Sequence, residues 1–129
     1  MILLDTHTWI WWVDDSAQLS PRAKGTIDTA AADSGFYLSS ISAWEVAMLV
    51  HQGKLQLTMD VDIWVAHTEA LPFVTFVPIS NRIAIQSVTL PIHPDPADRI
   101  IIATALSLGA TIVTKDSKMS AYTNIQTIW

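Results

Sequence analysis

The stretch MILLDTHTWIWWV, residues 1–13, joins a short apolar run to an acidic residue and then to an aromatic-rich segment. The run Ile2–Leu4 predicts a buried strand, because a strand covered on both faces is continuously apolar instead of alternating. It stops at Asp5, and residues from about Thr8 to Val13 have the character of a helix. A strand followed by a helix is the building unit of an α/β fold.

The same unit recurs along the chain. Strands are expected at residues 36–38, 73–77, 111–114 and, as a short last one, 125–128. Helices are expected from Ser20-Pro21 to about Ala32, from a cap at Ser40 or Ser42 to near Gly53, from Asp60 or Asp62 to about Leu71, from Ser80 to about Val88, and from Ala97 to Leu108 with a stop at Gly109. Pro91, Pro94 and Pro96 form a stiff connection before the last of these helices. The alternation predicts a three-layer α/β/α protein with a mainly parallel sheet of four to five strands.

Bulk composition points to one globular domain over residues 1–129. Half of the residues are hydrophobic and 15% are charged, which excludes a disordered tail. Cysteine is absent, so disulfides and thiolate chemistry are excluded. The N-terminus has no basic segment and no long apolar run, so we expect no secretory signal, no membrane segment and a cytoplasmic location.

Net charge alone argues against nucleic-acid binding. Seven Lys and Arg against twelve Asp and Glu give a formal charge of −5, whereas a protein that holds phosphates by charge is expected to be basic. The objection weakens if several acids are metal ligands, because bound divalent ions reverse the local potential. Charge therefore leaves the question open.

Four acids are expected to converge. Asp5 and Asp116 follow the first and fourth predicted strands, and the carboxyl ends of parallel strands are where such folds bind ligands. Glu45 lies between Ile41 and Leu49 on an apolar helical stripe. Asp98 opens the helix that begins at Ala97, shares a face with the apolar residues Ile101, Ile102 and Ala105, and has Asp95 one turn before it.

Carboxylates on core-facing stripes are costly unless they are paired or bind a metal. Few bases lie nearby in sequence, namely Arg99, Lys115 and Lys118. The acids therefore indicate a hard divalent cation, Mg²⁺ or Mn²⁺, held by oxygen ligands. The matching chemistry is hydrolysis of a phosphodiester, in which no protein nucleophile is needed.

Each acid also has a structural interpretation. Asp5 and Asp116 are acceptable turn residues, and Asp95 and Asp98 are favoured at a helix N-terminus. Glu45 is the hardest to explain in this way and would need a salt bridge. Each of these structural interpretations is reasonable for one acid, but together they do not explain why so many acids are expected to lie in one place.

Four segments together resemble the PIN-domain family, in particular its VapC-type toxins. They are Leu3-Leu4-Asp5-Thr6-His7, Ser42-Ala43-Trp44-Glu45-Val46-Ala47 with Gly53-Lys54-Leu55, His93-Pro94-Asp95-Pro96-Ala97-Asp98-Arg99-Ile100, and Val113-Thr114-Lys115-Asp116. They occur in the family's order and span nearly the whole chain.

The resemblance implies a Rossmann-like fold and an acidic pocket made by Asp5, Glu45, Asp98 and Asp116. It also implies cleavage of single-stranded RNA with Mg²⁺ or Mn²⁺, a homodimer and a cognate VapB-like antitoxin. In such proteins a hydroxyl often assists, so Thr6 and Thr114 are second candidates. Asp95 is expected outside the direct ligands or as a helix cap.

The remaining candidates concern ligands and partners. Arg99 and Lys115 either contact phosphate or pair with neighbouring carboxylates. Trp9, Trp11 and Trp12 lie within one apolar helix and are either buried in the domain or an aromatic anchor at a partner interface. His7, His51, His67 and His93 lack the spacing of a zinc site and are expected to be structural or surface residues.

Other functions fit less well. Phosphatases with an aspartyl nucleophile commonly show Asp-x-Asp after the first strand, and here the residues are Asp5-Thr6-His7. A receiver-type signalling domain would need an acidic pair near the first strand and a phosphorylatable aspartate in mid-chain, and neither is evident. A non-catalytic scaffold that only binds a partner or RNA is the remaining alternative, and the set of acids disfavours it.

Overall fold

The computed structural model describes residues 1–90, 94–122 and 124–129. Its elements follow in the order β1 (Ile2–Leu4), α1 (Thr6–Val13), α2 (Pro21–Ala32), β2 (Phe36–Ser39), α3 (Ser40–His51), α4 (Val61–Glu69), β3 (Val74–Val77), α5 (Asn81–Val88), α6 (Pro96–Leu108), β4 (Thr111–Val113), α7 (Ser117–Ser120) and β5 (Thr127–Ile128). The predicted connection through Pro91 and the segment containing His93 lie outside the described residues.

The described strands form one parallel sheet in the order β3-β2-β1-β4-β5. The central strand β1 pairs with β2 through Leu4 and Leu38, and with β4 through Leu4 and Val113. The first strand in sequence therefore lies in the middle of the sheet, and both of its neighbours run in the same direction. This confirms the parallel α/β sheet expected from the alternating pattern.

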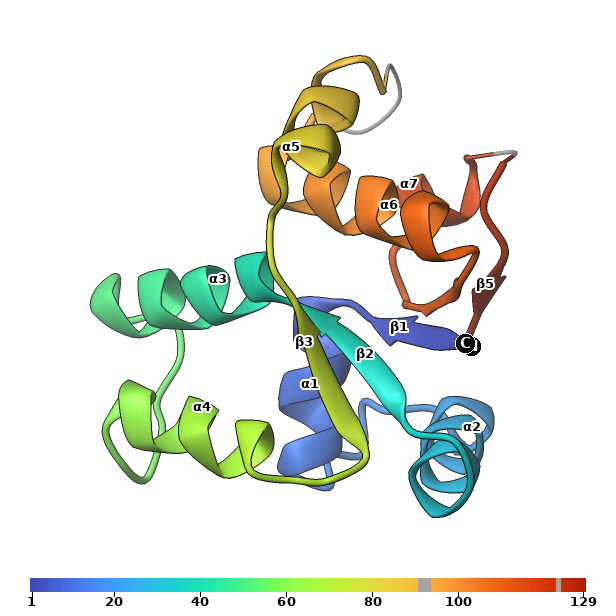
Figure 1. The fold of residues 1–129 in the computed structure, drawn as a ribbon. Helices are drawn as coiled ribbons and strands as arrows, with labels where there is room; N and C mark the ends of the chain where they lie inside the picture. The colour runs from blue at the N-terminus through green and yellow to red at the C-terminus, as the bar shows by residue number, and fades with distance from the viewer. Residues whose placement is uncertain (91–93, 123) are drawn as a thin grey trace.

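Helices cover both faces of the sheet (Figure 1). Alternate side chains of β1 divide between two cores: Leu4 packs with residues of α1, α2 and α4, and Leu3 packs with residues of α5, α6 and α7. The helix α3 contributes to both cores, through Val46 to the first and Ile41 to the second. The protein thus has three layers, and α3 stands at the carboxyl ends of the strands, where it contacts each layer.

Local signals place most helix ends correctly. Ser20 and Ser80 accept hydrogen bonds from Ala23 N and Ile83 N, and Gly109 ends α6 with a positive φ of 65°. The prediction for α3 is wrong in detail: its cap is Ser39, the last residue of β2, so the strand passes into the helix without a loop. The short helix α7 was not predicted.

Tryptophans of α1 build the first core. The side chain of Trp9 is fully buried, its ring centroid lies 4.6 Å from that of Trp64, and its Nε1 donates to Thr68 Oγ1 at 3.1 Å. Of the two alternatives given for Trp9, burial in the domain is the one observed, because the folded chain itself covers this side chain, and Trp9 is no longer a candidate for a partner contact. Trp12 is half-buried, packs edge-on against Phe36 and donates to Asp28.

Within the described residues, no helix combines the length and the apolar character that a membrane crossing requires.

Candidate metal centre

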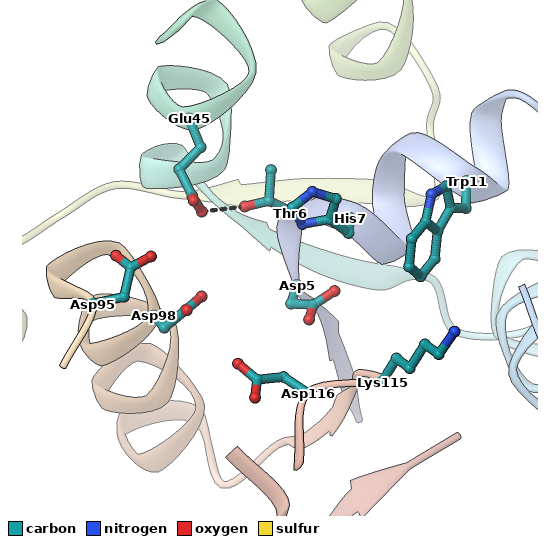
Figure 2. A pocket seen from close by; sticks show the side chains of 9 residues that line it. All are labelled: Asp5, Thr6, His7, Trp11, Glu45, Asp95, Asp98, Lys115 and Asp116. Atoms are coloured by element: carbon teal, nitrogen blue, oxygen red, sulfur yellow. Dashed lines mark hydrogen bonds between the residues drawn. The ribbon is translucent and has the colours of Figure 1, made fainter. Parts of the chain in front are cut away.

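An acidic cavity of about 430 Å³ opens at the carboxyl edge of the sheet (Figure 2). Side chains from four separate parts of the chain line it: Asp5, Thr6, His7, Trp11, Glu45, Asp95, Asp98, Lys115 and Asp116. The four acids predicted to converge are all among them. Because β1 and β4 are neighbours in the sheet, residues 5 and 116 meet although they are far apart in sequence.

Asp5 follows β1 directly and caps α1. Its Oδ1 accepts a hydrogen bond from Thr8 N at 2.9 Å, and its Oδ2 accepts one from Thr114 Oγ1 at 2.5 Å. Burial raises the pKa of Asp5, and the hydrogen bonds from Thr114 and Thr8 oppose that rise. Both oxygens therefore have fixed directions, which orients the carboxylate toward the cavity.

Glu45 reaches the cavity from α3, where it is buried. The Thr6 hydroxyl donates to Glu45 Oε1 at 2.5 Å and lies 2.9 Å from the Oγ of buried Ser42. Burial raises the pKa of Glu45, the Thr6 hydrogen bond lowers it, and the negative charge of Asp95 raises it further. Thr6 thus holds a carboxylate in place, which gives this predicted assisting residue a definite contact.

Asp95 and Asp98 come from the start of α6. Asp95 caps the helix through Oδ1, which accepts from Ala97 N at 2.9 Å. Oxygens of Glu45, Asp95 and Asp98 all lie within 4.8 Å of one another. Burial, followed by the charges of Asp95 and Glu45, raises the pKa of Asp98 to about 8. Asp95 is therefore part of the carboxylate cluster as well as a helix cap, which is more than its sequence position indicated.

Asp116 follows β4 and caps α7, its Oδ1 accepting from Lys118 N at 2.8 Å. Its own backbone N–H donates to Thr114 Oγ1 at 3.0 Å. The Thr114 hydroxyl therefore connects the backbone of Asp116 to the side chain of Asp5. This residue, the second predicted hydroxyl, is 1% exposed, and its hydroxyl contacts both acids.

The two basic candidates, Lys115 and Arg99, differ in their position relative to the cavity. Lys115 lines the cavity, with Nζ 5.9 Å from the centre of the Trp11 ring, whereas Arg99 is half-buried on α6 and is not among the described lining residues. His7, which sequence spacing assigned to a structural or surface role, is exposed on the cavity wall. The missed signal is its position in the first turn of the helix after the central strand, two residues beyond Asp5.

The donor set fits a divalent cation. Carboxylate oxygens are the ligands that Mg²⁺ and Mn²⁺ prefer, and three of these groups approach within 4.8 Å. The charges of Asp95, Glu45, Asp116 and Asp5 all raise the pKa of Asp98, so the acids repel one another. A positive charge among them would relieve that repulsion.

A three-layer α/β fold with carboxylates gathered beyond the central strand is the arrangement of an α/β protein with a candidate divalent-cation site at the carboxyl edge of its sheet. The PIN domain model matches residues 2–124, and the chain belongs to the PIN-domain family. It is also a homologue of VapC ribonucleases: ribonuclease VapC22 of Mycobacterium tuberculosis is 33% identical over 132 residues, which cover 99% of this chain and 98% of that protein.

Solved structures show the same fold. A toxin–antitoxin complex from Klebsiella pneumoniae aligns with a TM-score of 0.68 and 20% identity, over 100% of this chain and 97% of that one. FitAcB from Neisseria gonorrhoeae aligns with a TM-score of 0.70 and 23% identity, over 100% and 97%. VapC20 of M. tuberculosis, a sarcin–ricin loop cleaving toxin, aligns with a TM-score of 0.70 and 14% identity, over 98% and 99%.

Proposed function

We propose that this VapC homologue is a metal-dependent endoribonuclease and the toxin of a toxin–antitoxin pair, its active site being the acidic cavity. The observation that carries the proposal is the convergence of Asp5, Glu45, Asp98 and Asp116 in one cavity, in a chain that belongs to the PIN-domain family. Asp95 adds a fifth carboxylate to the site. These residues are proposed to hold Mg²⁺ or Mn²⁺.

A divalent cation held by these carboxylates would acidify a water molecule and neutralise negative charge on the phosphate. In the reaction, the water oxygen attacks phosphorus, the bond from phosphorus to the leaving ribose oxygen breaks, and that oxygen gains a proton. The carboxylates of the site are the groups that take up and return the proton. Asp98, with its pKa of about 8, keeps a proton at neutral pH until positive charge enters the cavity.

Hydroxyl groups and the lysine have supporting roles. Thr114 and Thr6 hold the carboxylates of Asp5 and Glu45 by hydrogen bonds, which limits their reorganisation during the reaction. Among the residues that the structure describes, Lys115 is the lysine that lines the cavity, and its ammonium group is suited to contact a phosphate of the substrate. The wall also contains His7, whose exposed ring can donate a hydrogen bond to the same phosphate.

Partners follow from the family. The Klebsiella structure is a toxin–antitoxin complex, and this supports a VapB-like antitoxin as the partner of our chain. We further propose that residues 1–129 form one domain, that it assembles as a homodimer, and that it acts in the cytoplasm on RNA. Half-buried Trp11 and Trp12 stay candidates for a partner contact.

The test is RNA cleavage with a matched pair of isosteric variants. A panel of structured and single-stranded RNAs is incubated with Mg²⁺, Mn²⁺ or EDTA and wild type, Asp5→Asn or Asp62→Asn. Asp62 is exposed on α4 and serves as the control. We expect metal-dependent cleavage by wild type and Asp62→Asn and a loss of at least about 100-fold in Asp5→Asn.

Two results would contradict the proposal. Cleavage that survives in Asp5→Asn would place the active site elsewhere. The second result is folded, antitoxin-free wild type that cleaves none of the RNAs and does not bind Mn²⁺ in calorimetry. This result would indicate a non-catalytic scaffold.

A further inference from the structure

The two ends of the acidic cavity differ in chemistry (Figure 2). At one end lie the clustered carboxylates of Glu45, Asp95 and Asp98. At the other end Trp11 stands above Lys115, with Asp5 between the two ends. A substrate that bridges the cavity therefore meets carboxylates on one side and an aromatic, basic surface on the other.

Trp11 packs against two other rings. The ring of Trp129 meets it edge-on, with centroids 5.8 Å apart and planes at 62°, and the ring of His7 lies 5.7 Å away at 50°. Trp11 is nevertheless only half-buried and contributes to the cavity wall. It differs in this from Trp9, whose ring is enclosed by the core. An indole braced by neighbours and open on the cavity side loses little conformational entropy on binding a planar group.

Lys115 adds a charge to this surface. Its Nζ lies over the Trp11 ring, 5.9 Å from the ring centroid, and the side chain is exposed. A flat aromatic face next to a cation is the pairing that proteins use for single-stranded nucleic acid, because bases stack on the ring and the phosphate meets the charge.

We propose that Trp11 is a stacking platform for the nucleobase adjacent to the cleaved phosphodiester, and that Lys115 binds the phosphate of that nucleotide. This inference rests on the proposed function and names a substrate subsite within the same cavity. Every base has a π face, so the subsite accepts different bases but requires one that is unpaired. Trp11 thereby selects single-stranded positions and leaves sequence selection to other contacts.

The experiment measures RNA binding by fluorescence anisotropy, in Ca²⁺, with two labelled probes. One probe is a single-stranded RNA decamer of mixed sequence, and the other is the same ribose–phosphate chain without bases. The proteins are wild type, Trp11→Leu, Trp11→Phe and, as control, Trp44→Ala. Leucine keeps apolar volume against Trp129, phenylalanine keeps a ring, and Trp44 is an exposed tryptophan of α3 that is not among the described lining residues.

We expect Trp11→Leu to weaken binding of the base-bearing decamer about tenfold, Trp11→Phe to weaken it much less, and Trp44→Ala to have no effect. The decamer without bases should bind wild type and Trp11→Leu equally. Equal losses on both probes, or no loss on either, would overturn the stacking role. Unchanged RNA binding together with weaker self-association or antitoxin binding would assign Trp11 to a partner contact instead.

Cleavage in Mn²⁺ separates this inference from the proposed function. If wild type cleaves RNA and Trp11→Leu binds both probes like wild type, only the subsite is refuted. If wild type cleaves no RNA but its binding depends on the ring at position 11, the stacking role of Trp11 stands, whereas the nuclease proposal and the place of the base beside a cleaved phosphodiester both fail.

Discussion

Replacing Asp98 by asparagine should stabilise the metal-free protein while removing its function. The pKa of this carboxyl rises from 3.8 to about 8 through burial and the charges of Asp95 and Glu45. A group whose folded pKa is raised binds more protons in the folded state, so stability falls as pH rises from about 4 to 8. Asparagine cannot ionise and therefore does not impose this loss.

The size of the effect follows from the shift. About four pH units at 1.36 kcal/mol each would correspond to roughly 6 kcal/mol in a fully enclosed site. Asp98 is only partly buried, so solvent screening reduces the expected difference to about 1–2 kcal/mol at pH 8.5. For a chain of this length that is roughly 3–8 °C in Tm.

The assay is thermal unfolding of wild type, Asp98→Asn and Asp62→Asn in EDTA at pH 4.5 and 8.5. We expect Asp98→Asn to be the most stable of the three at pH 8.5 and to resemble the others at pH 4.5. Adding Mn²⁺ should reverse the order, because the cation stabilises only a protein that binds it. The reasoning is refuted if Asp98→Asn is no more stable than wild type at pH 8.5, or if Mn²⁺ stabilises both equally.

Three further substitutions test single contacts. Thr114→Val leaves a buried carboxylate without its hydroxyl donor and should cost about 1–3 kcal/mol in urea unfolding, with a loss of RNA cleavage. Thr6→Val removes a hydrogen bond that lowers the pKa of Glu45, so the acidic limb of the cleavage pH profile should move to higher pH. Trp9→Ala should destabilise the fold by about 3–5 kcal/mol, because it empties part of the core. The same change at exposed Trp44 should stay within about 0.5 kcal/mol.

Matched controls make these outcomes decisive. Thr111→Val places the same substitution in β4 at a half-buried position, where it should change neither unfolding nor cleavage. If Thr114→Val behaves like this control, its hydroxyl does not hold the site together. If the pH profile of Thr6→Val overlays that of wild type, Glu45 does not limit the reaction.

Local signals in the sequence predicted much of the fold. The apolar runs gave strands at the right places, and Ser20-Pro21, Ser80 and Gly109 marked helix ends because caps and breakers act through neighbouring residues. The start of α3 escaped prediction because several serines lie close together. Pairing of Ser39 with Val77 makes Ser39 the last strand residue and hence the cap. That pairing joins strands that are distant in sequence, so local sequence patterns do not reveal it.

The same distinction holds for the site. Asp5 and Asp116 could be placed together from sequence because the end of a parallel strand is a predictable location. Asp95 is expected beside the site, one turn before Asp98, but only outside the direct ligands or as a helix cap. Its approach to Glu45 depends on the packing of α6 against α3, which local sequence patterns do not show. The sequence also did not show which of Trp9, Trp11 and Trp12 lies in the core and which lines the cavity. A helix that is apolar on all sides has no polar face to indicate which side packs against the sheet.

The hydrogen bond from Thr114 to Asp5 joins residues 109 positions apart, and it has a consequence for biosynthesis. During synthesis β1 and Asp5 leave the ribosome well before β4, which pairs with β1 and precedes Asp116, because α1 to α6 and the strands β2 and β3 are made in between. A nascent chain that ends before β4 therefore has Asp5 without Thr114 and Asp116, and its acidic site is incomplete.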